Sequence, residues 1–520
     1  MNSDATFSTP TLSGAVFDAL PDSIRSYIRY LEVTIHQQQI QIQQQQIQIQ
    51  QQQVRIQQQQ VRIQQLKTRV HELETRLSKD SSNSSKPPSS DGLKRKPKSQ
   101  RGKSDKKPGG QRGRIGKGLA QVKNPDVIVT HAPTSCNGCG SNLDTVGGFC
   151  AEKRQVFEIP QPKIEVTEHH ALEKKCPCCG EITTASFPEN IRGPVQYGDR
   201  VRALVAYFAH QHFIPVDRVC EIFEDIFGVA LSPGTCANVD ERLFANLESF
   251  EVGLKIYLLA ARVLHFDETG MRCEKKLYWV HVASSEMATL YTMHAKRGQE
   301  AMEAADILPR YQGTAVHDHW FPYFSFEQLT HALCNAHHLR ELTFVHEEEG
   351  EEWAKRMFDF LIETNGEVEK HVVQGGLSPE TLLQIEQSYQ QILIDGFAYH
   401  ALLPPLPTGK RGKQKQRDGK NLLNRLKEKR DCVLRFAWDF SVPFTNNQGE
   451  RDIRMVKLKQ KIAGCFRAFN GGQIFCRIRS YISTARKQGW NIWDALADAI
   501  RGSPRLLANN QSAIAQTGVA

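Results

Sequence analysis

Three acidic residues lie in sequence contexts that could bring them together at one metal site. Asp267 lies in ARVLHFDETG and Asp318 in GTAVHDHWFPY, and each follows an apolar run typical of a short buried strand. Glu450 lies in TNNQGERDIRMVKLKQK, a segment rich in Arg and Lys that has the composition of a helix. Two carboxylates at strand ends and one on a helix can converge on Mg²⁺ or Mn²⁺, ions that prefer oxygen ligands and hold phosphate oxygens well.

Neighbouring acids compete with two members of this trio. Glu268 follows Asp267 directly, and Asp452 lies two residues after Glu450. Because adjacent residues of a strand point to opposite faces, only one of Asp267 and Glu268 can enter the site. A single Asp after a strand is also commonly a turn or capping residue. The residue types alone therefore leave ordinary structural roles open for each acid.

Four ordered sequence blocks connect the trio to a known family. The segments HFDET, HDHW, CNAHHLREL and NNQGERDIR resemble the signature blocks of insertion sequence 66 family transposases. The resemblance extends from about Asn83 to near residue 500, and it includes NSSKPPSSDG and a CxxC pair before the core. Several ordered blocks with acidic residues in place are far more specific than one block. The resemblance implies a DDE transposase with a ribonuclease-H-like catalytic core.

The resemblance also implies roles for the three acids. Asp267 would bridge two divalent ions, Mg²⁺ or Mn²⁺, and Asp318 and Glu450 would each complete one ion's coordination. Two ions about 3.5–4 Å apart can serve both the attacking and the leaving oxygen of an in-line displacement at phosphorus. Water would first cleave DNA at the ends of the element, and the exposed 3′-hydroxyl would then attack target DNA. No covalent protein–DNA intermediate is required, so no Ser or Tyr nucleophile is predicted.

Two cysteine pairs predict one structural zinc site. CNGCG contains Cys136 and Cys139, and CPCCG contains Cys176 and Cys179. Each pair has the CxxC spacing of a zinc knuckle, and four thiolates around Zn²⁺ leave no open position for chemistry. The segment between the pairs, RQVFEIPQPKIEVTEHHAL, has the alternation of strands. The alternative is a set of thiols without metal.

Another Cys and His pair invites a metal interpretation. In CNAHHLREL, a helical spacing of three or four residues places Cys334 beside His337 or His338. No second ligand pair lies nearby in the sequence, so core packing is the preferred interpretation for these residues.

The formal net charge of +9 is concentrated in one stretch. Residues 94–117 contain eleven Lys or Arg and one Asp, and the formal charges of all other residues sum to −1. Ser, Pro and Gly around them exclude a packed core, so the alternatives are a solvated tether or a basic arm along DNA phosphates. The predicted DNA-binding residues lie in this arm and beside Glu450, and they are Lys94, Arg95, Lys96, Lys98, Arg101, Arg112, Arg114, Arg451, Arg454 and Lys457.

The Gln-rich segment from Ile24 to Leu77 has a sevenfold apolar repeat. An unbroken row recurs every seven residues, at Ile28, Ile35, Ile42, Ile49, Ile56, Ile63, Val70 and Leu77. This spacing predicts a coiled coil and therefore self-association. Gln occupies the middle of the companion row and weakens the seam. The alternative is a Gln-rich low-complexity expansion.

Helices and strands alternate in the remainder of the chain. Residues 198–253 have helical patterns, and LSPGTCANV could begin the recognition helix of a helix-turn-helix unit or an ordinary helix. The pattern then predicts three strands, an amphipathic helix over GQEAMEAADILPRY and a further strand that ends near Asp318. His317 and His319 flank this Asp and are candidates to position water or phosphate. A helical insertion with a basic loop at 409–420 separates Asp318 from Glu450.

The composition limits the class of protein. A length of 520 residues predicts roughly three to four domains, and 40% hydrophobic residues suffice for a sizeable core. Thirteen cysteines, clustered at two places, argue against a disulfide framework. No stretch reaches the ~18 consecutive apolar residues of a membrane helix, and the N-terminal residues do not have the pattern of a secretory signal. We therefore expect a soluble, cytoplasmic protein of bacterial type, associated with the nucleoid.

Together these segments predict a multidomain α/β protein. In chain order we expect an N-terminal segment (1–23), a coiled coil (24–78), a basic disordered linker (79–125), a zinc ribbon (126–190), a helical DNA-binding region (191–255), a ribonuclease-H-like core (256–345 and 441–470) with a helical insertion (346–440), and a C-terminal helical region (471–520). The predicted partners are double-stranded DNA at the element ends and target, a second copy of the chain, and accessory proteins of the same element. The alternative function is a catalytically inactive DNA-binding regulator.

Overall fold

The computed structural model describes residues 14–79, 118–404, 406 and 416–507. The predicted DNA-binding residues between Lys94 and Arg114 lie outside these ranges. The chain divides into two compact units, of which one contains the N-terminal helices and the other everything from Arg95 onward. In the part of the chain that is described, no helix is both long and apolar enough to cross a membrane.

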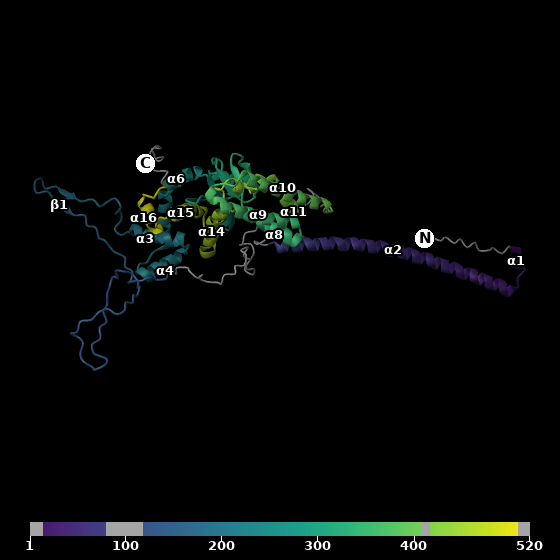
Figure 1. Ribbon diagram of the computed structural model, residues 1–520, viewed down its shortest axis with the longest axis horizontal. Coiled ribbons are helices and arrows are strands. Elements are labelled where there is room, and N and C mark those ends of the chain that lie inside the picture. The colour runs from purple at the N-terminus through teal and green to yellow at the C-terminus, as the bar shows by residue number, and fades with distance from the viewer. Residues whose placement is uncertain (1–13, 80–117, 405, 407–415, 508–520) are drawn as a thin grey trace. The chain divides into compact units, whose positions relative to one another are not determined.

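The N-terminal unit is dominated by one continuous helix. A short α1 (Gly14–Asp18) precedes α2 (Asp22–Ser78), a helix of 57 residues that contains no Gly or Pro (Figure 1). The sevenfold row lies along α2, and its side chains are exposed from Ile35 to Val70; Ile35, Ile42 and Ile49 are each 53% exposed. A long helix with an uncovered apolar row has the form that a coiled-coil strand requires, and the coiled coil itself remains a prediction.

The cysteine-rich segment contains two similar tight turns and little regular structure. Its two strands, β1 (Glu173–Lys175) and β2 (Ile182–Thr184), pair antiparallel around the second CxxC sequence. The prediction of strands over residues 154–172 is wrong, because this segment forms no strand. Pro160 and Pro162 interrupt the alternation, and Val156 and Val166 are 89% and 88% exposed, so no surface covers the apolar side.

Helices precede the sheet of the larger unit. α4 (Val216–Phe227) ends at Gly228, whose φ of 67° closes a left-handed cap, and the Ser232 side chain then caps the N-terminus of α5. α5 buries Cys236, Val239 and Leu243 and packs against α3 and α16. The elements here are α3 (Asp199–Ala206), a π-helical turn η2 (Tyr207–Gln211), α4, α5 (Pro233–Asn246) and α6 (Glu248–Leu259).

A five-stranded mixed sheet lies at the centre of the larger unit. Its order is β5-β4-β3-β6-β7, with β3, β4 and β5 antiparallel and β3, β6 and β7 parallel. A two-residue turn joins β3 to β4, and its Glu274 and Lys275 have φ values of 51° and 64°, as a type I′ turn requires. The strands are β3 (Val263–Cys273), β4 (Lys276–Ser284), β5 (Thr289–His294), β6 (Thr314–His317) and β7 (Thr330–Leu333).

The helix predicted over residues 298–311 is shorter in the structure. α7 spans only Gln299–Ala304. Asp306 then adopts a φ of 56°, which a helix does not allow, and Pro309 follows three residues later. Ile307, Leu308 and Tyr311 are buried from turns, so their apolar spacing reflects core packing without a helix.

Helices also cover the sheet. The helices that lie between β7 and α14 along the chain form a second apolar core. This core includes Trp353, Tyr389 and Leu426. α15 packs against β5, and most of its length from Ile474 to Ala485 is buried. The remaining elements are η3 (Phe321–Ser325), α8 (Asn335–Glu349), α9 (Glu352–His371), η4 (Val372–Gln374), α10 (Pro379–Leu402), α11 (Asp418–Glu428), α12 (Arg430–Val433), α13 (Arg435–Trp438), α14 (Asn447–Ala463), α15 (Phe469–Lys487) and α16 (Ile492–Arg501).

Candidate functional site

The sheet and α14 place the three predicted acids in one region. Asp267 lies in β3, two residues beyond the last β3–β6 pair, His265 with Val316. Asp318 follows the end of β6, where its Oδ1 accepts a 2.9 Å hydrogen bond from the backbone N–H of Trp320. Glu450 lies in the first turn of α14, which packs on β3 and β4.

The three carboxylates are partly buried and interact electrostatically. Burial raises the pKa of Asp267 well above its usual range, and the charges of Glu268, Asp318 and Glu450 raise it further. Burial also raises the pKa of Asp318 and of Glu450, while Arg297 opposes the shift at Asp318 and Arg340 and Arg454 oppose it at Glu450. Acids from three separate elements therefore share one weakly solvated volume.

This volume fits a divalent cation. Among the described residues, no basic side chain forms a hydrogen bond or ion pair with Asp267, whose Oδ1 accepts a 2.8 Å bond from the backbone N–H of Glu268. The Oε1 atom of Glu450 is buried and has no hydrogen-bond partner. Buried carboxylate oxygens without protein cations or donors are stabilised when a metal ion binds them.

Asn446 joins the elements that position two of the acids. Its side-chain amide donates a 2.7 Å bond to the Phe266 carbonyl, and its Oδ1 lies 2.8 Å from His265 Nδ1. Its backbone carbonyl accepts the backbone N–H of Glu450 at 3.1 Å. Sequence reasoning did not single out Asn446, although it lies in the TNNQGERDIR segment.

The two rival acids have structural partners. Glu268 accepts hydrogen bonds from Arg297 at 2.7 Å and from the Tyr323 hydroxyl at 2.5 Å, and its side chain is only 2% exposed. Arg297 also lies over the ring of Trp320, with 4.0 Å between the guanidinium carbon and the ring centroid. The partners of Glu268 therefore lie in the segment between β5 and α7 and in η3 after β6.

Asp452 is held by a different network on the far side of α14. Its Oδ2 accepts bonds from Ser284 at 2.5 Å, Gln448 at 2.9 Å and Lys487 at 2.7 Å. This set links α14 to β4 and α15. Its full set of donors distinguishes Asp452 from Glu450, whose Oε1 has none.

The basic residues on α14 differ in their surroundings. Arg451 and Arg454 are exposed, whereas the ammonium group of Lys457 donates to the Gly270 carbonyl and burial lowers its pKa. Lys457 therefore braces α14 against β3. Arg297 and Arg340 are basic residues near the acids that sequence reasoning missed, because the fold brings them there from other elements.

Of the two histidines that flank Asp318, His317 is buried and His319 is partly buried. His317 lies 2.9 Å from His331 through their ring nitrogens and stacks on Tyr323, and burial lowers its pKa to about 3. Burial likewise lowers the pKa of His319 to about 3. Both rings are neutral at pH 7, and His317 packs behind the site instead of facing a substrate.

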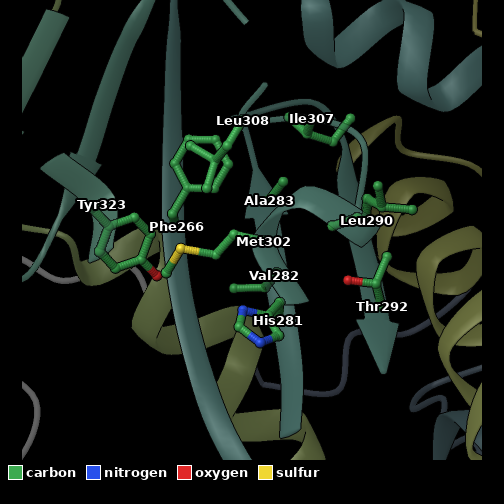
Figure 2. Close-up of a pocket in the computed structure, with 11 residues that line it drawn as sticks. Phe266, His281, Val282, Ala283, Leu290, Thr292, Met302, Ile307, Leu308 and Tyr323 are labelled. Carbon is green, nitrogen blue, oxygen red and sulfur yellow. The ribbon is translucent and has the colours of Figure 1, made fainter. Parts of the chain in front are cut away.

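An apolar cavity lies next to β3. Figure 2 shows Phe266, Met302, Leu290 and Tyr323 around it, and its empty volume is about 320 Å³. His281 also lines it, and burial lowers the pKa of this imidazole to about 4. The lining offers few polar groups to a ligand, so the chemistry of the region belongs to the acids.

Each cysteine pair forms a knuckle. The backbone N–H of Gly140 donates to the Cys136 carbonyl, and that of Gly180 donates to the Cys176 carbonyl, both at 2.9 Å. Hydrogen bonds from Ser141 lower the pKa of the Cys139 thiol, and backbone donors at Cys179 and Cys178 lower that of Cys176. Thiols with a lowered pKa are suited to metal binding. Across the described ranges, the four sulphur atoms do not gather into one group.

The side chains whose ligand atoms do gather are Cys334, His337 and Glu450. These atoms all lie within 4.8 Å of one another. Among the described residues, this is the one group of at least three His, Cys, Asp or Glu side chains whose ligand atoms lie that close together. Core packing was the sequence-based interpretation of Cys334 and His337. Glu450 lies more than a hundred residues further along the chain, so no local pattern connected it with Cys334 and His337.

Comparison with protein families agrees with the arrangement of the site. Residues 194–474, more than half of the chain, match the transposase IS66 family. Residues 133–180 match the zinc-finger binding domain of transposase IS66, and residues 34–120 match a family of unknown function, DUF6444. The search of curated proteins found no match. These domains indicate zinc binding and DNA binding, and the chain belongs to the IS66 family of insertion sequence transposases.

Proposed function

We propose that this transposase is a DDE enzyme in which Asp267, Asp318 and Glu450 form the strand cleavage site of a ribonuclease-H-like core. The observation on which the proposal depends is the electrostatic coupling of three partly buried acids from β3, the end of β6 and α14. The strand order β5-β4-β3-β6-β7, with the first acid on the central strand, is the arrangement that the family resemblance implies.

Two Mg²⁺ or Mn²⁺ ions at these carboxylates would supply charge stabilisation to both oxygens of an in-line displacement at phosphorus. Asp267 would hold both ions, and Asp318 and Glu450 would each hold one. Partial burial of the three acids strengthens their electrostatic effect. Arg297 and Tyr323 fix Glu268 in a neighbouring position, which leaves Asp267 as the acid of this pair that is free to bind an ion.

DNA would approach along the exposed side of α14. Arg451 and Arg454 are exposed beside Glu450 and can pair with phosphates next to the scissile bond. The basic arm, from Lys94 to Arg114, would follow the DNA backbone with strong salt dependence. Cys136, Cys139, Cys176 and Cys179 would hold one structural Zn²⁺ when the two knuckles come together.

Self-association would occur through α2. The exposed sevenfold row of α2 is uncovered in a single chain, and a second copy would cover it. Sedimentation velocity would test this: Ile42→Lys with Ile49→Lys should yield monomers, whereas Gln43→Lys with Gln50→Lys should not. Equal assembly of both double variants would reject the coiled coil. Accessory proteins of the same element would be additional partners.

Strand transfer provides the test of the chemistry. The substrate is an oligonucleotide that carries a precleaved end of the native element with a free 3′-hydroxyl, mixed with plasmid target and Mg²⁺. The proposal predicts joined products in which the oligonucleotide 3′-end is covalently linked to target DNA. Glu450→Gln should abolish joining while DNA binding persists. Joining by Glu450→Gln at the wild-type rate would contradict the assignment of the third acid.

A further inference from the structure

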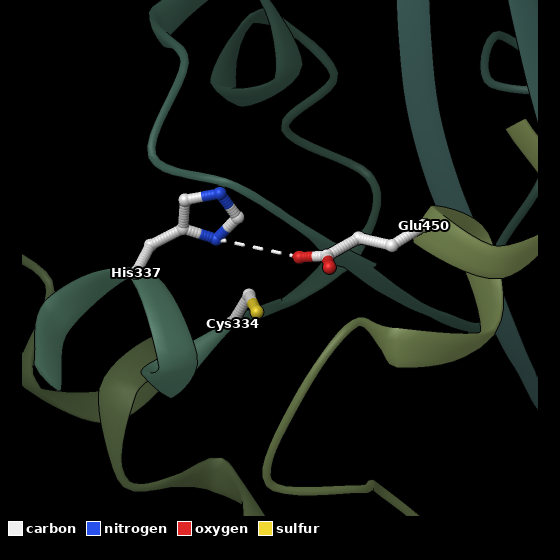
Figure 3. A group of neighbouring side chains, drawn as sticks. All are labelled: Cys334, His337 and Glu450. Atoms are coloured by element: carbon white, nitrogen blue, oxygen red, sulfur yellow. Dashed lines mark ion pairs between the residues drawn. The ribbon is translucent and has the colours of Figure 1, made fainter. Parts of the chain in front are cut away.

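Cys334, His337 and Glu450 form a compact group of three different metal-ligating side chains. Figure 3 shows the imidazole, the thiol and the carboxylate pointing toward one volume between α8 and α14. His337 Nδ1 and Glu450 Oε1 are 3.9 Å apart, which is too long for a hydrogen bond. Bonds of about 2.0–2.1 Å to a tetrahedral ion separate a nitrogen and an oxygen ligand by roughly 3.4 Å, so a small contraction would complete the site.

Two of the three ligand atoms in this group are buried and have no hydrogen-bond partner. His337 Nδ1 and Glu450 Oε1 are both buried without a hydrogen-bond partner, and Cys334 is 1% exposed. Burial lowers the pKa of His337 to about 4, so its ring is neutral at pH 7. Two buried polar atoms that face each other beyond hydrogen-bond distance leave each other unsatisfied, which is unfavourable. A bound cation would satisfy both.

The backbone fixes the positions of all three residues. Cys334 precedes the first residue of α8, and its carbonyl accepts the backbone N–H of His337 at 3.1 Å. The backbone N–H of Asn446 donates to Cys334 Sγ at 3.1 Å and so ties the thiol to the start of α14. The helix turn of α8 and the N-terminus of α14 thus hold the three side chains together before any ion binds.

The donor set determines the class of ion. Sulphur, imidazole nitrogen and one carboxylate oxygen suit Zn²⁺ or Co²⁺, whereas Mg²⁺ selects oxygen ligands. We propose that Cys334, His337 and Glu450 bind one zinc-class transition-metal ion, at a site separate from the Cys₄ zinc finger. Binding would release the Cys334 thiol proton to solvent as the metal–sulphur bond forms.

The site shares Glu450 with the proposed strand cleavage site. Metal binding by this group does not depend on the proposed function. Only its consequence, that a zinc-class ion withdraws Glu450 from catalysis, rests on that function. Zn²⁺ at micromolar concentration should therefore inhibit cleavage in Mg²⁺ by withdrawing an essential carboxylate.

Cobalt titration of full-length protein that carries one zinc per chain, in the finger, tests the binding. Because zinc already fills the finger, added Co²⁺ should bind with a stoichiometry of one per chain and show a thiolate-to-cobalt charge-transfer band. Cys334→Ser should abolish this band, and His337→Gln or Glu450→Gln should weaken Co²⁺ binding roughly tenfold or more. If the wild-type protein binds no Co²⁺ outside the zinc finger, the proposal is overturned, and this outcome does not depend on the folding of any variant.

Two matched controls separate the site from general effects. His346, also on α8, lies 3.9 Å from Glu352 through Nδ1 and Oε1 but has no cysteine beside it, so His346→Gln should leave the band unchanged. Cys476 is a buried cysteine outside the group, and Cys476→Ser should also retain the band. Loss of the band in either control, or its persistence in Cys334→Ser, would overturn the assignment.

The cobalt experiment and the cleavage assay fail independently. If cobalt binds as described but the protein cleaves no DNA in Mg²⁺, the proposed function is wrong and the metal site stands. If the protein cleaves DNA but binds no cobalt outside the finger, the proposed metal site is wrong and the proposed function stands.

Discussion

The side-chain amide of Asn446 donates a 2.7 Å hydrogen bond to the backbone carbonyl of Phe266, the residue before Asp267. Asn446 also accepts the first-turn N–H of Glu450 through its own carbonyl. A single buried residue thus fixes the distance between a central strand and the helix that brings the third acid. The proposed metal chemistry depends on this distance, because carboxylates on separate elements must meet the same ions.

Replacement of Asn446 should loosen this connection. Asn446→Ala leaves the buried Phe266 carbonyl without its donor, so we expect a loss of about 1–3 kcal/mol in the free energy of unfolding. Strand cleavage should fall more than stability accounts for, because Glu450 loses its fixed position. Denaturant unfolding and cleavage rates at a temperature where the variant is folded would measure both. Asn447→Ala, an exposed neighbour, is the control and should change neither.

Asp452 should prove structural despite its proximity to Glu450. Only 12% of the Lys487 side chain is exposed, and Asp452→Asn removes the charged partner of its ammonium group. We expect this unpaired charge to destabilise the protein by about 3–5 kcal/mol. The double variant Asp452→Asn with Lys487→Met removes the unpaired charge and should regain part of this loss. A folded Asp452→Asn that has wild-type stability but no Mg²⁺-dependent cleavage would instead identify Asp452 as the catalytic acid.

Glu351 should make stability depend on pH. Burial raises the pKa of this carboxyl to about 7, whereas the hydrogen bond from Trp353 opposes the shift. The folded state therefore holds its proton more tightly than the unfolded state, and the contribution of Glu351 to stability decreases as pH rises from about 4.5 through about 7. Its slope is at most about 1.4 kcal/mol per pH unit.

Denaturant unfolding across pH 4.5–8 would detect this contribution as the difference between wild type and Glu351→Gln. The difference isolates Glu351 from His400, which lies 3.0 Å away and whose pKa burial lowers, so that its own contribution has the opposite sign. Glu352→Gln is the matched control because Glu352 is adjacent and its side chain is 81% exposed. Identical pH profiles for wild type and Glu351→Gln would disprove the prediction.

Arg451 and Arg454 should contribute to DNA affinity through phosphates. Their replacement together by Ala should weaken binding to specific and nonspecific DNA by similar factors. The slope of log Kd against log salt should also fall by about 0.9 for each lost phosphate contact. Titrations at several salt concentrations measure this slope. The control Lys355→Ala, on a helix away from the acids, should leave this slope unchanged. A slope for the double Arg variant equal to that of the wild type would exclude phosphate contact.

The strands that precede the acids were predictable from sequence because they are continuous apolar runs. Val263–Phe266 and Thr314–Val316 lie in β3 and β6, as such runs predict for the buried centre of a sheet. The apolar spacing after Gly298 was misleading, because the same positions can be buried from turns when a residue such as Asp306 leaves the helical conformation.

The surroundings of the acids could not be predicted from sequence. Whether Glu268 or Asp452 is free depends on Arg297 and Lys487, which only the folded chain brings to them. For the same reason Cys334 and His337 looked like core residues until α14 placed Glu450 beside them. Local patterns encode strands and helices, but they do not encode which side chains meet across elements.

The most direct test of the central claim is to map nicks at nucleotide resolution on a plasmid that contains this gene's native flanking DNA. Purified protein with Mg²⁺ is compared with Asp267→Asn. The proposed function predicts discrete nicks at a pair of inverted ends, absent from the variant although it still binds those ends. Nicks of equal position and yield with Asp267→Asn, or binding to the ends without nicks in either Mg²⁺ or Mn²⁺, would contradict it.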